Sequence, residues 1–310
     1  MMKSKSRLAA VCCSLAWLAT GIHAQTPECD NNCLNAIATQ YLLDVAKQDS
    51  SQLPWADQVR YTENNVGMMI GDGFWGADPA ILGEGLLLPD ASTGNVVWFG
   101  LTTEHGQAAY HGLRLQVVNR QITEVESYLG REGQPEVFAK VEGYVRHTSF
   151  GEGVPAGGRQ SREQLIALVD GYFNSKQQNN GQLQTSFTND CEQKTNGMSI
   201  TSGDHWAAKA VQGCEAQFKA GVFKPVDRIR ARRYPVVNAE TGVVVALSIE
   251  DHAARYVDYT MLDGKPLAVQ VEYPNSRGKL DLFKIVDGKI SHIDGVSVFL
   301  PYYINSLWQQ

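Results

Sequence analysis

Two ten-residue stretches decide the fold: VVWFGLTTEH at residues 96–105 and VVVALSIEDH at residues 243–252. Each begins with valines, follows closely on a glycine, and ends on an acidic residue or pair and a histidine. Runs rich in β-branched residues next to glycine are typical of strands. Their similarity predicts that the two halves of the chain are copies of one strand-rich unit.

The segments that flank these strands also recur. Tyr41–Asn65 and Tyr172–Asn196 have equal length, which aligns Tyr41 with Tyr172 and Asn65 with Asn196. Each begins in a segment with helical spacing of apolar residues, and Ser161 with Gln164 forms a capping box before the second helix. The second copy is longer in its connections.

A glycine-rich stretch, Gly151–Gly158, separates the copies and predicts a linker. We therefore expect domains over residues 25–150 and 161–310, joined by residues 151–160. Each copy reads as an N-terminal helix followed by antiparallel strands, which gives an α+β fold. A sheet curved around its helix encloses a concave cavity that suits a ligand.

Residues 1–24 have the pattern of a signal peptide. Lys3, Lys5 and Arg7 precede an apolar stretch, Leu8–Thr20, and Ala24 offers a cleavage site before Gln25. The stretch is shorter than the roughly 20 residues of a membrane span. We expect a secreted or periplasmic protein with no membrane attachment after cleavage, and a retained anchor is the alternative.

Four cysteines follow this segment: Cys29, Cys33, Cys191 and Cys214. In an exported chain they predict two disulfides with three connectivities, and we favour Cys29–Cys33 with Cys191–Cys214. Neither pair has the spacing of a zinc site, so we expect no metal.

The composition narrows the functional classes. The chain has 310 residues, 43% hydrophobic and 19% charged, with a formal net charge of -6. This is a globular composition, and its acidic balance argues against nucleic-acid binding. The sequence has no dinucleotide fingerprint and no Gly-x-Ser-x-Gly elbow, so covalent serine catalysis and redox chemistry are disfavoured.

Several motifs resemble an uncharacterised exported family of fungi and bacteria. They are Cys29–Cys33, Val59–Asn64, Asn196–Met198, Arg232–Val237 and Asp251 with His252. Both copies look like NTF2-like (SnoaL-like) cone domains, which together cover nearly all of the mature chain. The resemblance implies two tandem cones, each with a curved, mostly antiparallel sheet packed on N-terminal helices. It also implies acid–base chemistry in an apolar cone without a cofactor, although the superfamily includes members that only bind.

Strand alternation selects the catalytic candidates. Along residues 243–252, Asp251 shares the apolar face of Val243, Val245 and Leu247, so we expect it to enter the cavity. On the last strand His292 and Asp294 share an apolar face and form the best acid–base pair. The alternatives are a strand-end carboxylate held by a loop and a structural His–Asp pair.

Other polar residues are candidates for binding. Arg60 and Glu63 lie on the predicted strand before Asn65, and Asn196, Arg233 and Tyr172 belong to the second copy. They can orient a hydroxyl, carbonyl or anionic group, or form internal ion pairs that support the sheet.

The sequence thus predicts an exported, cofactor-independent lyase, isomerase or hydrolase. Its partner is a small, largely apolar, oxygenated molecule, and a homo-oligomer is left open. A non-catalytic small-molecule-binding or assembly protein is the alternative.

Overall fold

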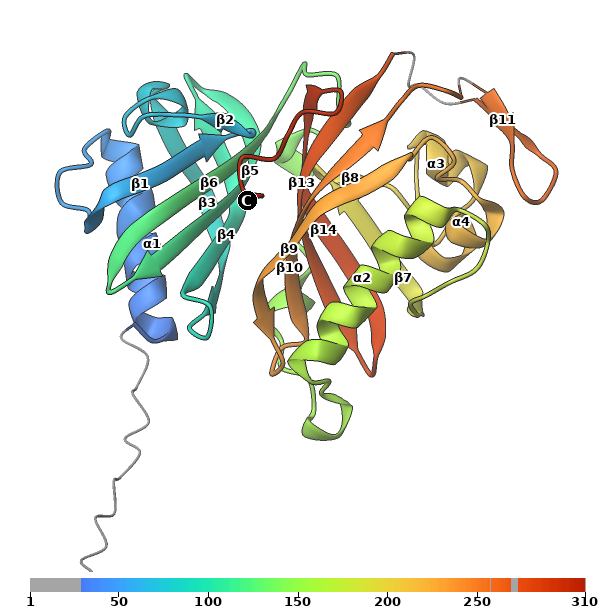
Figure 1. Ribbon diagram of the computed structural model, residues 1–310, viewed down its shortest axis with the longest axis horizontal. Coiled ribbons are helices and arrows are strands. Elements are labelled where there is room, and N and C mark those ends of the chain that lie inside the picture. Colours follow the sequence, from blue (N-terminus) through green and yellow to red (C-terminus); the bar gives the residue numbers. More distant parts are fainter. Residues whose placement is uncertain (1–28, 257, 269–272, 310) are drawn as a thin grey trace, which may run out of the picture.

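The computed structural model of the chain describes residues 29–256, 258–268 and 273–309 (Figure 1). The predicted signal peptide lies outside these residues. Two six-stranded sheets stand next to each other, and each is packed on a long helix on its far side. None of the helices among the described residues is long and apolar enough to cross a membrane.

The first domain contains one long helix, a short 3-10 turn and six strands. In chain order these are α1 (Asn31–Lys47), β1 (Trp55–Glu63), β2 (Val66–Gly67), η1 (Gly73–Gly76), β3 (Pro79–Asp90), β4 (Asn95–Glu104), β5 (Gln107–Val118) and β6 (Gln121–Arg131). The strand order is β2-β1-β6-β5-β4-β3. All neighbours are antiparallel except β1 and β6, which run parallel.

The second domain repeats this order and adds two short helices and a small hairpin. Its elements are α2 (Arg162–Gln178), β7 (Phe187–Thr195), β8 (Met198–Ser199), α3 (Trp206–Ala210), α4 (Cys214–Ala220), β9 (Arg228–Asn238), β10 (Val243–His252), β11 (Asp258–Thr260), β12 (Pro266–Ala268), β13 (Asn275–Val286) and β14 (Lys289–Pro301). The sheet order β8-β7-β14-β13-β10-β9 matches that of the first domain strand for strand. The predicted α+β class with two tandem domains is confirmed. Three short 3-10 turns, η2 (Val141–Gly143), η3 (Thr148–Gly151) and η4 (Ala156–Gly158), lie in the connection between the domains.

Local chemistry fixes where the helices begin. Asp30 caps α1 by accepting from the backbone N–H of Cys33 at 2.8 Å, and the Cys29–Cys33 disulfide closes the same turn. The predicted capping box of Ser161 and Gln164 starts α2. Cys191–Cys214 joins β7 to α4. Both preferred disulfides are confirmed, and the second one anchors the longer connection of the second domain.

An asparagine clamp shows how the repeat is built. Asn196 follows β7 with a φ of 44° and hydrogen-bonds both the N–H and the C=O of Ser297 in β14. Asn64 follows β1 with a φ of 48° and bonds the N–H and C=O of Leu129 in β6 in the same way. The structural counterpart of Asn196 is therefore Asn64 and not Asn65, because the connection between helix and strand is one residue longer in the second copy.

The sheets pack against each other through their outer faces. Phe99, Tyr110 and Tyr128 of the first sheet contact a layer of aliphatic residues in the second: Val243, Val245, Leu247, Leu280, Leu282, Val296 and Val298. A Cβ on Gly112 would lie 2.9 Å from the Leu280 side chain, so a larger residue there would displace that side chain. The central strands are thus buried on both faces.

The C-terminal segment also ties the two domains together. After β14 it crosses to β1, where Asn305 and Leu307 bond the side chain of Asn65 and the Trp308 Nε1–H donates to Thr62 at 3.1 Å. Arg114 and Arg233 lie over the Trp308 ring, one from each domain.

Replacing Asn196 by alanine tests the clamp. The change removes three hydrogen bonds and leaves the buried N–H of Ser297 without its acceptor. We expect Asn196→Ala to lower the free energy of unfolding by about 2–4 kcal/mol in denaturant titration. Asn189→Ala, at an exposed position of β7, is the control and is expected to change the free energy of unfolding by under about 0.5 kcal/mol. Equal stability of the two variants would contradict the clamp.

Candidate active site

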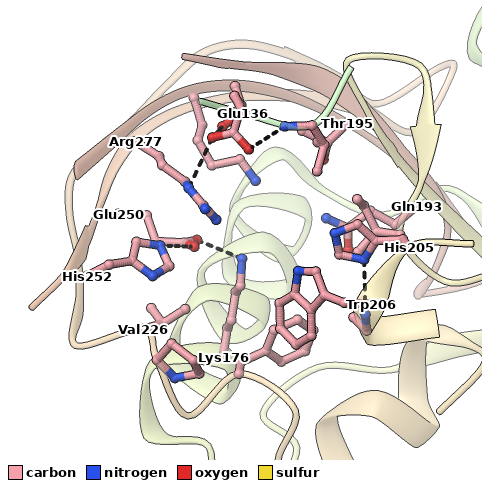
Figure 2. A pocket seen from close by; sticks show the side chains of 17 residues that line it. Glu136, Lys176, Gln193, Thr195, His205, Trp206, Val226, Glu250, His252 and Arg277 are labelled. Atoms are coloured by element: carbon pink, nitrogen blue, oxygen red, sulfur yellow. Dashed lines mark hydrogen bonds and ion pairs between the residues drawn. The ribbon is translucent and has the colours of Figure 1, made fainter. Parts of the chain in front are cut away.

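The second domain encloses a cavity between its helix and its sheet. This inner cavity has a volume of about 80 Å³ and is lined by Lys176, Gln193, Trp206, Glu250 and His252 among others. It adjoins a larger outer recess of about 470 Å³, since Glu136, Val137, His205, Trp206 and Arg277 line both. The inner part has room for about two or three waters. Figure 2 shows the side chains that line the inner cavity.

A chain of buried charged groups forms one wall of the inner cavity. The Lys176 Nζ, from the last turn of α2, lies 2.6 Å from the Glu250 Oε2 on β10. The other carboxylate oxygen of Glu250 lies 2.9 Å from the His252 Nε2. Figure 2 shows these three side chains facing Gln193, His205 and Trp206 across the cavity. All three side chains are at most 7% exposed.

Ion pairing decides the charge of Glu250. Burial by itself raises the pKa of this carboxyl, but the Lys176 ammonium and the hydrogen bond to His252 outweigh it. The pKa of Glu250 is therefore held well below its ordinary value, and the group is a carboxylate at neutral pH.

His252 is neutral and has one nitrogen left over. Burial, and then the positive charge of Arg277, lower the pKa of its imidazole. A carboxylate can only accept, so Glu250 fixes the ring proton on Nε2. Within the part of the chain that the structure describes, the buried Nδ1 has no hydrogen-bond partner. A residue that lines the cavity thus carries an unprotonated, buried imidazole nitrogen.

A second buried pair extends this wall, because Lys279 also lines the inner cavity. The Lys279 Nζ is 3.4 Å from the Asp281 Oδ2, and both side chains are at most 7% exposed. Burial raises the pKa of Asp281, while Asp281 and Glu250 together raise that of Lys279. The interior of this domain therefore carries several ionisable groups at strand positions that usually hold apolar side chains.

The first domain has no charged pair at the equivalent positions among the described residues. Matching helix ends and hairpin registers align Lys176 with Val45, Glu250 with Thr102, and Asp281 with Leu113. His111 takes the place of Lys279, and its ring packs edge-on against Phe74 and Trp98. Burial lowers the pKa of His111 to about 3. The interior of the first domain is filled by its own aromatic side chains: Tyr41, Phe74, Trp75 and Trp98.

The predicted residue Asp251 lies on the other side of the sheet. The strand alternation is as expected, but the face of Asp251 packs toward the first domain and the face of Glu250 and His252 lines the cavity. Arg230 binds both oxygens of the Asp251 carboxylate, at 2.7 and 3.0 Å, and Ser276 donates to it at 2.6 Å. Asp251 is thus a fully paired interface carboxylate.

His292 and Asp294 share a face, and that face meets the connection between the domains. The His292 ring stacks on His147 with centroids 3.4 Å apart. The Asp294 carboxyl accepts from the Tyr144 hydroxyl at 2.8 Å. Burial raises the pKa of Asp294 to about 7. Neither residue lines the inner cavity or the outer recess.

The predicted binding residues are spread over the molecule. Tyr172 comes nearest, because its hydroxyl donates to the Gln193 side chain at the cavity wall, at 3.1 Å. Asn196 serves the clamp described above. Glu63 binds Arg131 at 2.6 Å, and Arg233 binds Glu126 across the domain interface at 2.5 Å. Arg60 lies over Trp308.

Lys176 and Glu250 line the cavity but were not predicted from the sequence, because each stands in an ordinary sequence pattern. Lys176 reads as an ordinary cation in the last turn of a helix, and Glu250 differs from Asp251 by one strand position. Among residues 29–256, 258–268 and 273–309, no group of three or more His, Cys, Asp or Glu is placed to hold a metal.

Comparison with known proteins adds to this description. A family model described as a domain of unknown function (DUF8021) matches residues 158–297, in the second domain. No curated protein matches the chain.

Solved structures of single-domain length are similar to parts of the chain. A protein assigned as a ketosteroid isomerase from Kribbella flavida is 15% identical with a TM-score of 0.29, over 38% of this chain and 93% of that one. An NTF2-like protein from Cytophaga hutchinsonii is 14% identical with a TM-score of 0.28, over 45% and 99%. LinA is 12% identical with a TM-score of 0.26, over 48% and 94%. The duplicated strand order and the helix on each sheet establish the class of fold, a tandem of two α+β domains with the same strand order.

The raised pKa of Asp294 gives a stability prediction with a definite sign. A carboxyl whose folded pKa exceeds its unfolded pKa binds more protons when folded, so stability falls as the pH rises from about 4 to about 7. An asparagine at this position would keep a neutral acceptor for Tyr144. We expect Asp294→Asn to raise the free energy of unfolding at pH 8 by about 1–4 kcal/mol and to change it little at pH 4.5. A variant that is less stable at pH 8 would show that the ionised carboxylate is the stabilising form.

Proposed function

We propose that the second domain is a cofactor-independent acid–base enzyme, a lyase, isomerase or hydrolase acting on a small oxygenated molecule. The observation that carries the proposal is the His252 Nδ1, a buried base in the wall of a cavity, without a partner among the described residues. The first domain, with its aromatic-filled interior, is a structural partner in this proposal.

In the proposed mechanism His252 removes a proton from the substrate. Glu250 holds the ring in the required tautomer and stabilises the imidazolium that forms, and Lys176 keeps Glu250 ionised. Negative charge that develops on a substrate oxygen needs donors. The oxygen of Gln193 accepts from Tyr172, so its amide nitrogen is the atom left to donate, and the Trp206 indole N–H lies on the same side of the cavity.

Export of the chain is part of the proposal. Two disulfides, one in each domain, favour folding in an oxidising compartment. We infer that residues 1–24 direct the chain there and that the mature protein is secreted or periplasmic. The alternative, a binding protein without turnover, shares the cavity but needs no base.

The protonation state and tautomer of His252 can be measured without a substrate. We expect the ¹⁵N spectrum of the imidazole to show an Nε2–H tautomer at pH 7 and to remain neutral at pH 6, because burial depresses its pKa. In Glu250→Gln the preference for this tautomer should weaken. An imidazolium at pH 7 would remove the base from the mechanism.

Turnover gives the decisive test. With any substrate found in a screen of small carbonyl and hydroxyl compounds, His252→Gln should lower kcat by about 10²–10⁴-fold. His105→Gln, at an exposed turn, is the control and should be unchanged. For the native enzyme kcat/KM should be flat from pH 7 to 8 and fall with acidification below the ordinary histidine range. Full activity of His252→Gln would refute the proposed base.

A further inference from the structure

Arg277 stands where the inner cavity and the outer recess adjoin. It lies on β13 directly opposite Glu250 of β10, and it lines both spaces. Its guanidinium extends into the pocket in Figure 2. The side chain is 25% exposed, so it can be reached from the recess while remaining largely enclosed by protein.

One edge of the Arg277 guanidinium faces a carboxylate. Its Nε lies 3.0 Å from a carboxylate oxygen of Glu136, whose position is set by the Ser297 hydroxyl at 3.1 Å. The Nε–H is not aligned with that oxygen for a hydrogen bond. Among the described residues, none accepts a hydrogen bond from Nη1 or Nη2 of Arg277. The N–H groups on Nη1 and Nη2 of Arg277 can therefore donate to a ligand.

The recess around the Arg277 guanidinium has mixed walls, with Glu136, Asp204 and Asn275 on its polar side and an apolar side formed by four residues. Trp206, Phe299, Met198 and Val137 line the apolar side. His205 adds no positive charge near neutral pH, because burial and the nearby Arg277 lower its pKa to about 4. Arginine presents parallel N–H groups that match a carboxylate, and flat apolar walls suit an aromatic ring.

We propose that the pocket takes small aromatic carboxylates, with the carboxylate bound by Arg277 and the ring against Trp206 and Phe299. This inference rests on the proposed site and names its substrate class. The outer recess is large enough for a single ring, whereas the inner cavity admits only a reacting substituent. Such a substituent would point toward His252, on the strand next to Arg277.

Benzoate and its neutral isostere benzamide test this inference. Titrated into the mature protein and followed by ligand-observed NMR, benzoate should bind at least about tenfold more tightly than benzamide, since a charge-assisted bidentate contact is lost in the amide. Arg277→Gln should weaken benzoate binding by about ten- to a hundredfold and change benzamide binding less than about twofold. Arg255→Gln, an exposed arginine outside the pocket, is the matched control.

The outcomes separate this inference from the proposed chemistry. His252→Gln should still bind benzoate, so loss of the catalytic proposal leaves the carboxylate site intact. The inference is overturned without any variant if the wild-type protein does not saturate with benzoate, or if it binds benzoate and benzamide equally. Equal weakening of both probes by Arg277→Gln would show that arginine acts through packing and would also overturn it.

Discussion

The packing of the two sheets against each other is the constraint on which the rest of the structure depends. Val245, Leu247 and Leu280 of the second sheet lie against Phe99 and Tyr128 of the first, in a continuous apolar layer. Because this layer occupies the outer faces, each sheet has its inner face left for its own helix. The interior of each domain is thus the space between helix and sheet, and the inner cavity of the second domain lies there.

The interiors of the two domains differ in polarity. A buried ion pair is no gain in stability over well-packed apolar residues, and breaking one is costly. The first domain has apolar residues at two of the equivalent positions. Val45 corresponds to Lys176 of the second domain, and Leu113 corresponds to Asp281. Retaining buried charges around an open cavity in one copy alone is expected where those charges act on a ligand.

The sequence predicted the repeat better than it predicted the site. Periodicity and capping identified both helices, and cysteine positions identified both disulfides, because these depend on local geometry. Alternation along residues 243–252 correctly separated Asp251 from Glu250. It failed to show which face lines the cavity, because the Asp251 face is apolar for a different reason: it meets another sheet. That contact lies between residues far apart in the chain, and no local pattern encodes it.

The pocket is built from residues of the second domain and of the connection that precedes it. Glu136 and Val137 come from the connection that follows the first domain, yet they line the cavity of the second. Asn196 holds this connection by donating to the Val137 carbonyl, and its own carbonyl accepts from Ala139. The same residue that closes β7 onto β14 therefore sets the wall opposite Lys176 and positions the carboxylate beside Arg277. A second domain cut free before residue 161 would keep its charges and lose the wall that encloses them.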